Sequence, residues 1–323
     1  MMDEHRFEQG GPRGQRPGTP APVPTGAAAV HCAVSFSEVE PLVRFAASVG
    51  AGAPDGTAGL AASAPEWAAL LAARPPLRIQ FGNEFCQRLL PSIAALERAL
   101  GAASAAGLAF GLVLPMLTDA GIERAERLLG RLPPDTEVTV NDWGVLRRLT
   151  RGFPALRATA GRLLCRMLKE PRAPSAAYLH LGGHGFATPG LQTLLERFGI
   201  ERVEVDVPPF VQAGDLRGFS GQLSVHAPLG FATTGRICRI GNLRCSAARQ
   251  FATGHTCARE CLSYWSELSI ARRAGSESLR LLQRGNTIFY RHSVPMARAL
   301  AAVLAAGAAD RLVLPGEGLP CGS

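Results

Sequence analysis

Half of the chain's eight cysteines fall within one short stretch, between residues 234 and 265: Cys238, Cys245, Cys257 and Cys261. Thiolates bind metals and carry out redox chemistry. Eight cysteines in 323 residues are too few for a small disulfide-stapled scaffold, and no hydrophobic signal sequence opens the chain. We therefore expect a reducing, cytoplasmic location and a metal or redox role for the clustered cysteines.

Two of these cysteines have a spacing that suits ligands to one metal centre. Cys257 and Cys261 have three residues between them, so in a helix both thiols would lie on one side. Cys238 lies upstream, after an apolar run, and the distant Cys86 follows a predicted strand. Together they make a site of three local thiolates and one distant one, with Cys245 as a competitor for the place of Cys238.

Four thiolates are a ligand set for zinc or for an iron-sulfur cluster. Structural zinc sites usually have two close cysteine pairs, whereas this chain has one pair with a wider gap. The spacing therefore favours an iron-sulfur cluster. Cysteines that pack in the core without a metal are the alternative.

Polar side chains at the ends of other predicted strands are candidates for substrate binding. Asn141 and Asp142 end an apolar run, where they either face the site or cap the next helix. His226 follows a strand and either faces the substrate or makes a structural hydrogen bond. Arg291 is suited to pairing with the carboxylate of an anionic substrate, or it solvates a strand end.

Two further patterns have a structural interpretation. Glu204 and Asp206 alternate along one run and so share one face of a strand. That face is either the interior of a barrel or an exposed rim, and we expect exposure. The glycine-rich segment 180–185 contains two histidines, and its pattern predicts a loop rather than a phosphate site.

The elements that must position these residues alternate along the chain. Short apolar runs, bounded mostly by Gly, Pro or Asn, predict strands at 30–36, 77–82, 108–116, 137–142, 155–161, 203–209, 223–228 and 310–315. Apolar residues three and four apart predict amphipathic helices between them, such as 37–50, 120–132 and 188–200. This alternation predicts an α/β fold, a TIM-like (β/α) barrel that is closed or incomplete, with its function at the carboxyl ends of the strands.

Composition sets the boundaries of this domain. Residues 1–28 are rich in Gly and Pro, which predicts a disordered segment before a single barrel domain at 29–323 with a cysteine-rich insert at about 235–265. The apolar stretch 101–117 is short and rich in Ala, so no transmembrane segment is expected.

Other features argue against two function classes. The charge of +8 comes mostly from scattered arginines and does not predict a nucleic-acid surface. The HExxH motif of zinc proteases and the GxSxG motif of serine hydrolases do not occur in the sequence. A peptidase is therefore not supported.

Several short motifs occur in an order that resembles one family. They are "GNEFC" at 82–86, "EVTVNDWG" at 137–144, "VHAPLGFATTGRIC" at 225–238, "CAREC" at 257–261 and "RGNTIFYRH" at 284–292. On these motifs the chain is similar to the collagenase-like peptidase family U-thirty-two. Within that family it looks most like the UbiV group, which takes part in oxygen-independent hydroxylation in ubiquinone biosynthesis.

This resemblance implies a TIM-like barrel in which Cys86, Cys238, Cys257 and Cys261 bind a 4Fe-4S cluster, with Cys238 chosen over Cys245. It implies a heterodimer with a UbiU-like protein that hydroxylates a small aromatic or prenylated quinone-precursor ring. Prephenate is the implied oxygen donor in several members. A non-catalytic, cluster-bearing scaffold and an RNA base hydroxylase are the alternatives, and the peptidase name is read as a legacy of the family's history.

Overall fold

The structure is a computed structural model. It describes residues 30–51, 76–165, 167–171, 173, 175, 177, 185–212, 214–254, 256–269 and 279–317. The segment 1–28, which the sequence predicts to be disordered, and the two histidines of the glycine-rich loop lie outside the described residues.

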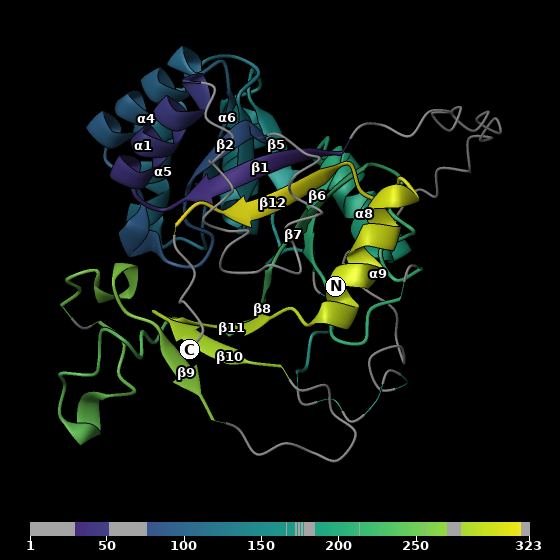
Figure 1. The fold of residues 1–323 in the computed structure, drawn as a ribbon. Helices are drawn as coiled ribbons and strands as arrows, with labels where there is room; N and C mark the ends of the chain where they lie inside the picture. Colours follow the sequence, from purple (N-terminus) through teal and green to yellow (C-terminus); the bar gives the residue numbers. More distant parts are fainter. Residues whose placement is uncertain are drawn as a thin grey trace, which may run out of the picture.

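Eight parallel strands close into a barrel in the order β1-β12-β7-β6-β5-β4-β3-β2 (Figure 1). They are β1 (His31–Phe36), β2 (Pro76–Gly82), β3 (Ala109–Leu114), β4 (Glu137–Val140), β5 (Arg157–Ala160), β6 (Arg202–Asp206), β7 (Gln222–His226) and β12 (Arg311–Pro315). β1 pairs with both β12 and β2, which closes the ring. The predicted TIM-like barrel is confirmed, and the barrel is complete.

Helices in the described residues connect most of these strands. They are α1 (Val39–Gly50), α4 (Ile93–Ala105), α5 (Asp119–Leu129), α6 (Trp143–Gly152), α8 (Pro189–Arg197) and α9 (Val294–Ala305). Side chains of Ser92, Thr118, Asp142 and Ser293 accept hydrogen bonds from the first turns of α4, α5, α6 and α9. These caps satisfy backbone N–H groups that a helix start leaves without partners. None of the described helices has the length and hydropathy that a membrane span requires.

The barrel strands direct their apolar side chains outward and their polar side chains inward. Alternate residues such as Val203 and Val205 of β6 belong to the hydrophobic core that the helices cover. Glu204 and Asp206, which alternate with these valines along β6, are fully buried in the barrel interior. The expectation that these two carboxylates are exposed is therefore wrong, because closure of the barrel turns the polar face of β6 toward other strands instead of solvent.

A second, antiparallel sheet stands over the carboxyl ends of the barrel strands, in the order β8-β11-β10-β9. Its strands are β8 (Leu229–Thr234), β9 (Ser266–Leu268), β10 (Leu281–Arg284) and β11 (Thr287–Arg291). Leu229, Phe231, Leu282 and Phe289 form a small apolar core, against which Phe85, Leu163 and Trp265 pack. Figure 1 shows this sheet below the barrel, with the cysteine-rich insert extending from it.

The cysteine-rich insert has little regular structure. Short 3-10 turns occur at η5 (Ala247–Arg249) and η6 (Glu260–Leu262), and others in the chain are η3 (Gln87–Leu89) and η4 (Gly185–Ala187). Arg259 has a left-handed conformation, with φ of 60°, between Cys257 and Cys261. These two cysteines therefore do not share one face of an α-helix, although the sequence analysis grouped them on the assumption that the segment is helical.

Candidate metal centre and adjoining pocket

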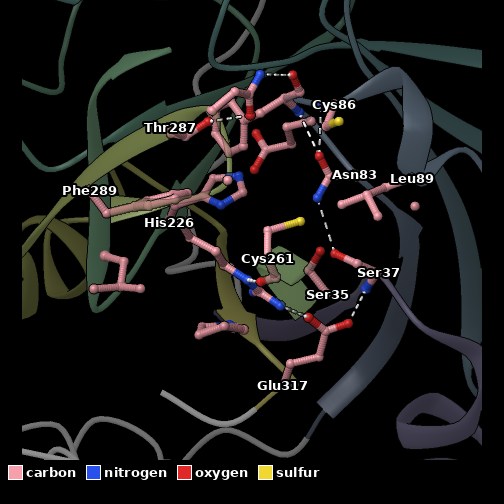
Figure 2. Close-up of a pocket in the computed structure, with 18 of the residues that line it drawn as sticks. Ser35, Ser37, Asn83, Cys86, Leu89, His226, Cys261, Thr287, Phe289 and Glu317 are labelled. Carbon is pink, nitrogen blue, oxygen red and sulfur yellow. Dashed lines mark hydrogen bonds and ion pairs between the residues drawn. The ribbon is translucent and has the colours of Figure 1, made fainter. Parts of the chain in front are cut away.

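A pocket with a cavity volume of about 120 Å³ lies between the barrel and the second sheet. Its lining includes the four cysteines predicted as ligands: Cys86, Cys238, Cys257 and Cys261. Figure 2 shows Cys86 and Cys261 among the side chains that line the cavity, together with His226 and Phe289. The thiols thus come together from the β2 loop and from two parts of the insert. Cys245 is not among the lining residues.

The loop that carries Cys86 is shaped by the last residue of β2, Gly82, and by the residue that follows it, Asn83. Gly82 has φ of 128°, and a Cβ there would lie 2.2 Å from the backbone oxygen of Val113, so only glycine fits. Asn83 accepts hydrogen bonds from the backbone N–H groups of Phe85 and Cys86, both at 2.9 Å. This turn directs Cys86 toward the cavity.

The tight turn between β10 and β11 joins the segments that carry the thiols. Arg284 Nε donates to the backbone oxygen of Cys261 at 2.8 Å. Asn286 Nδ2 donates to the backbone oxygens of Phe85, at 2.7 Å, and Gly235, at 2.6 Å, which adjoin Cys86 and the start of the insert. The turn therefore fixes the β2 loop and both ends of the insert relative to one another.

Gly285, at the centre of this turn, lies directly against two thiols. It has φ of 58°, and a Cβ built there would lie 3.1 Å from Cys261 Cβ, 3.5 Å from Cys261 Sγ and 3.9 Å from Cys238 Sγ. The glycine leaves free the space beside the sulfur atoms that a larger residue would fill.

Cys86, Cys238 and Cys261 lie in surroundings that disfavour the ionised form of a free thiol. Burial raises the pKa of Cys86 and Cys238, and neighbouring cysteines add to the effect. Burial and the other thiols raise the pKa of Cys261 to about 12. A metal ion that coordinates these groups would reverse this preference, because a cation stabilises the thiolate.

Backbone N–H groups point at the same sulfur atoms. Gly241 N lies 3.3 Å from Cys238 Sγ, and Arg259 N lies 3.4 Å from Cys257 Sγ. The N–H groups of Arg88 and Leu89 donate to Cys86. Hydrogen bonds to sulfur are one of the means by which proteins adjust iron-sulfur clusters.

The spacing of the thiols bears on which metal they suit. In the described residues, the group of three potential ligands whose atoms all lie within 4.8 Å of one another is Glu84, Glu204 and His226, and the thiols form no such group. A single zinc ion holds its sulfur ligands roughly 4 Å apart, given a zinc-sulfur bond of about 2.3 Å. No three of the described thiols lie within 4.8 Å of one another, and a multi-iron cluster has a wider ligand shell than a zinc ion.

Below the thiols, a buried arginine holds two carboxylates. Arg162 Nε donates to Glu84 Oε1 at 2.9 Å and Nη2 to Glu84 Oε2, while Nη1 donates to Asp206 Oδ1 at 2.6 Å. The guanidinium also lies 5.4 Å from the ring centre of Phe85. Lys169 Nζ donates to the other oxygen of Asp206. Because Glu84 is two residues from Cys86, this network anchors the β2 loop to the barrel.

The charges in this network stabilise one another. Burial alone would raise the pKa of Asp206, but Lys169 and Arg162 hold it well below its usual range. Burial lowers the pKa of Lys169 to about 8, against the opposing effect of Asp206. Asp206 is thus ionised at neutral pH, and the network is held together by charged hydrogen bonds.

The group formed by Glu84, Glu204 and His226 is not a further metal site. Both oxygens of Glu84 accept from Arg162. Glu204 Oε1 accepts from Gln80 and Thr139, and its Oε2 lies 2.8 Å from His226 Nε2. The carboxylates are therefore already paired, and the adjacent guanidinium opposes a second cation.

The other residues predicted for substrate binding lie away from the cavity lining. Asp142 caps α6 through hydrogen bonds from Gly144 and Val145. Asn141 is buried and its side chain bonds to the backbone of Leu114 and Leu163. Asn141, Asp142 and Arg291 do not line the pocket. Of the four residues predicted for substrate binding, His226 does.

Several residues of the site were not identified from the sequence. Arg162 and Asp206 stand at or just beyond the carboxyl ends of β5 and β6, a position that could have signalled them. Arg284, Gly285 and Asn286 fall within the quoted "RGNTIFYRH" motif, but nothing in their spacing indicates contact with cysteines far away in the chain.

No protein-family model matches the chain, and no curated protein is significantly similar to it. The functional interpretation therefore depends on the residues of the pocket and on the motifs of the sequence.

Proposed function

We propose that the chain binds a 4Fe-4S cluster through Cys86, Cys238, Cys257 and Cys261 and acts in oxygen-independent hydroxylation. The substrate is a ubiquinone-precursor ring, and the chain works in a complex with a UbiU-like partner. The observation that carries the proposal is that four thiols from three separate segments line one pocket. Prephenate is the proposed oxygen donor.

The donor set and its surroundings support a cluster at this position. All four side chains are thiols, backbone N–H groups point at Cys86, Cys238 and Cys257, and Gly285 leaves space beside two of the sulfurs. When bound, the cluster supplies electron transfer or binds an oxygen-bearing ligand.

The rest of the pocket suits an aromatic ring. Leu89, Phe85, Trp265 and Phe289 line the cavity with apolar surface that can contact a planar ring and exclude water. Arg88 lines the same cavity and brings positive charge to it, while the guanidinium of Arg284 is already paired with Glu317. A ring that carries a carboxylate, or a dicarboxylate donor, would pair with the guanidinium of Arg88.

A cluster-bearing scaffold without catalysis is the competing proposal. A scaffold would need no cavity beside its cluster, and the open space next to Cys86 favours an enzyme over it. RNA base hydroxylation remains a third proposal, and salt-sensitive binding of RNA would favour it.

The decisive experiment is iron and sulfide analysis, with an absorption spectrum, of protein purified without oxygen. Wild type is compared with Cys86→Ala, Cys238→Ala and Cys257→Ala, and with Cys245→Ala as the matched control from the same insert. We expect about four irons per chain in the wild type and in the Cys245 variant, with loss of the cluster in the other three.

The other outcomes are equally informative. A colourless protein with one zinc ion, or with no metal, would reject the hydroxylase proposal. Retention of iron in the Cys238 variant together with its loss in the Cys245 variant would mean that Cys245, not Cys238, is the ligand. A protein with a full cluster that fails to convert quinone precursors in the presence of its partner and prephenate would favour the scaffold.

A further inference from the structure

The imidazole of His226 has one nitrogen engaged and one facing the cavity. His226 is the last residue of β7, and its ring lines the pocket beside Phe289 (Figure 2). Its Nε2 lies 2.8 Å from Glu204 Oε2. Within the described part of the chain, Nδ1 makes no hydrogen bond. It is also not one of the fully buried polar atoms without a partner, so its surface is not completely covered. The second nitrogen is therefore accessible from the cavity.

Glu204 determines which nitrogen carries the proton. Its Oε1 accepts from Gln80 Nε2 at 2.6 Å and from Thr139 Oγ1 at 3.1 Å, which leaves Oε2 for the histidine. Burial alone would raise the pKa of Glu204, but the hydrogen bond and charge of His226, the hydrogen bond from Gln80 and the charge of Arg311 lower it to about 2. An ionised carboxylate can only accept, so Nε2 of His226 is the protonated nitrogen. In the neutral ring, Nδ1 then has a free lone pair.

The other charged groups near His226 are already paired or occupied. Glu84 and Asp206 accept from Arg162, and Asp206 also accepts from Lys169. His292, which follows β11, also interacts electrostatically with His226, and it does not line the cavity. These contacts leave Nδ1 of His226 as the basic atom that a bound molecule can reach at this end of the described pocket.

We infer that His226 is the proton acceptor of the pocket, that its substrate is a phenol, and that Glu204 is its positioning residue. The phenolic O–H bond breaks, its electron pair stays on oxygen, and the proton goes to Nδ1. The step consumes no oxidant or reductant. The resulting phenolate is richer in electrons at its ring carbons, which hydroxylation of the ring requires. The choice of an aromatic substrate rests on the proposed function.

The experiment combines two magnetic resonance measurements on the anaerobically purified protein. Histidine labelled with ¹⁵N reports the tautomer of each ring, and His226→Gln assigns the signal. We expect the Nε2–H tautomer for His226, and a mixture of tautomers in Glu204→Gln. The ¹⁹F signal of added 4-fluorophenol then reports its ionisation, and we expect bound phenolate in wild type and loss of that signal in His226→Gln.

The control is His31→Gln, which changes another barrel histidine at the opposite end, where its Nε2 accepts from Arg311. This variant is expected to keep the phenolate signal. His226→Asn, with a circular dichroism spectrum, replaces His226→Gln if that variant does not fold. An Nδ1–H tautomer, no binding of 4-fluorophenol, or phenolate that persists without His226 would each overturn the inference.

Iron analysis of the same samples separates this inference from the proposed function. A protein without iron that still ionises 4-fluorophenol through His226 would reject the hydroxylase and retain the proton acceptor. A protein with a full cluster whose His226 has the Nδ1–H tautomer would retain the cluster proposal and reject His226 as the proton acceptor.

Discussion

The two ends of the barrel contain the same kinds of residues but differ in what covers them. At the amino ends of the strands, Arg311 forms a two-point pair with Glu137, and Arg202 forms one with Asp310. At the carboxyl ends, Arg162 forms a two-point pair with Glu84. Ion pairs fill the barrel interior at the first end, while the second end opens into the pocket below the antiparallel sheet.

This difference shows that buried charge alone does not identify a functional site. Buried ion pairs are costly to desolvate and contribute little to net stability, so their presence at both ends is a property of the polar barrel interior. What distinguishes the carboxyl end is the set of thiols that lines its pocket and a histidine nitrogen that its neighbours leave available. The comparison can be tested with substitutions matched between the two ends.

The largest effect is expected from removal of the central arginine at each end. Arg162→Met leaves Glu84 and Asp206 with one positive partner, and Arg311→Met leaves Glu137 without its closest one. Each change should destabilise the fold by roughly 3–5 kcal/mol, because it leaves buried charge uncompensated. Urea unfolding followed by circular dichroism measures this loss.

The iron content of the same two variants should differ, because one substitution lies at the carboxyl end of the barrel and the other at the amino end. We expect Arg162→Met to lose iron, because Arg162 holds Glu84 beside Cys86, and Arg311→Met to keep it. Loss of iron from both variants would mean that the two ends are coupled, which would contradict the comparison.

An intermediate effect is expected from pH. Burial, aided by the charge of Arg162, lowers the pKa of His292 from 6.5 to about 3. The folded state therefore binds its proton less readily than the unfolded state, so stability is full above pH 6.5 and falls as the pH drops toward 3. Between pH 7 and pH 5 this group should cost roughly 2 kcal/mol.

Urea unfolding at pH 7 and pH 5 measures this dependence. His292→Gln should reduce the loss of stability between the two pH values. At the other end, His31 is half-buried and its pKa is also lowered by burial, so His31→Gln should have a smaller effect. An equal dependence on pH in wild type and His292→Gln would show that His292 does not titrate in this way.

The smallest effect on stability is expected from a matched pair of glycines. Gly285, at the carboxyl end, and Gly307, before β12 at the amino end, have φ of 58° and 67°. Alanine should cost about 1–2 kcal/mol at each, because a left-handed conformation strains an ordinary residue. A Cβ at Gly307 meets nothing within 4 Å, whereas one at Gly285 meets Cys261. We therefore expect Gly285→Ala alone to lose iron, and equal iron in both variants would contradict the role of the turn.

The barrel could be predicted from the sequence because each of its strands is a separate local pattern. All eight predicted runs, from 30–36 to 310–315, correspond to barrel strands, since short apolar segments bounded by turn residues are readable without knowledge of their partners. The helices α1, α5 and α8 were predicted for the same reason.

The interior and the second sheet could not be predicted in this way. The alternation in β6 establishes that Glu204 and Asp206 share a face, but only closure of the barrel decides which face is inside. β9 and β10 are short, and β11 pairs with β8 across a long separation in the chain, so no local pattern specifies this sheet. The spacing of Cys257 and Cys261 suggested a helix, but Arg259 between them is left-handed, and the turn at Gly285 lies against Cys261 and Cys238, which no spacing indicated.

The contact between Asn286 and Phe85 joins residues that are 201 positions apart in the chain. During synthesis, the loop of Cys86 leaves the ribosome long before the turn that fixes it to the insert. Closing so long a loop has an entropic cost that only the finished barrel offsets. The pocket can therefore be completed only after translation has passed residue 317, and the supply of any metal must be timed to the end of folding rather than to its beginning.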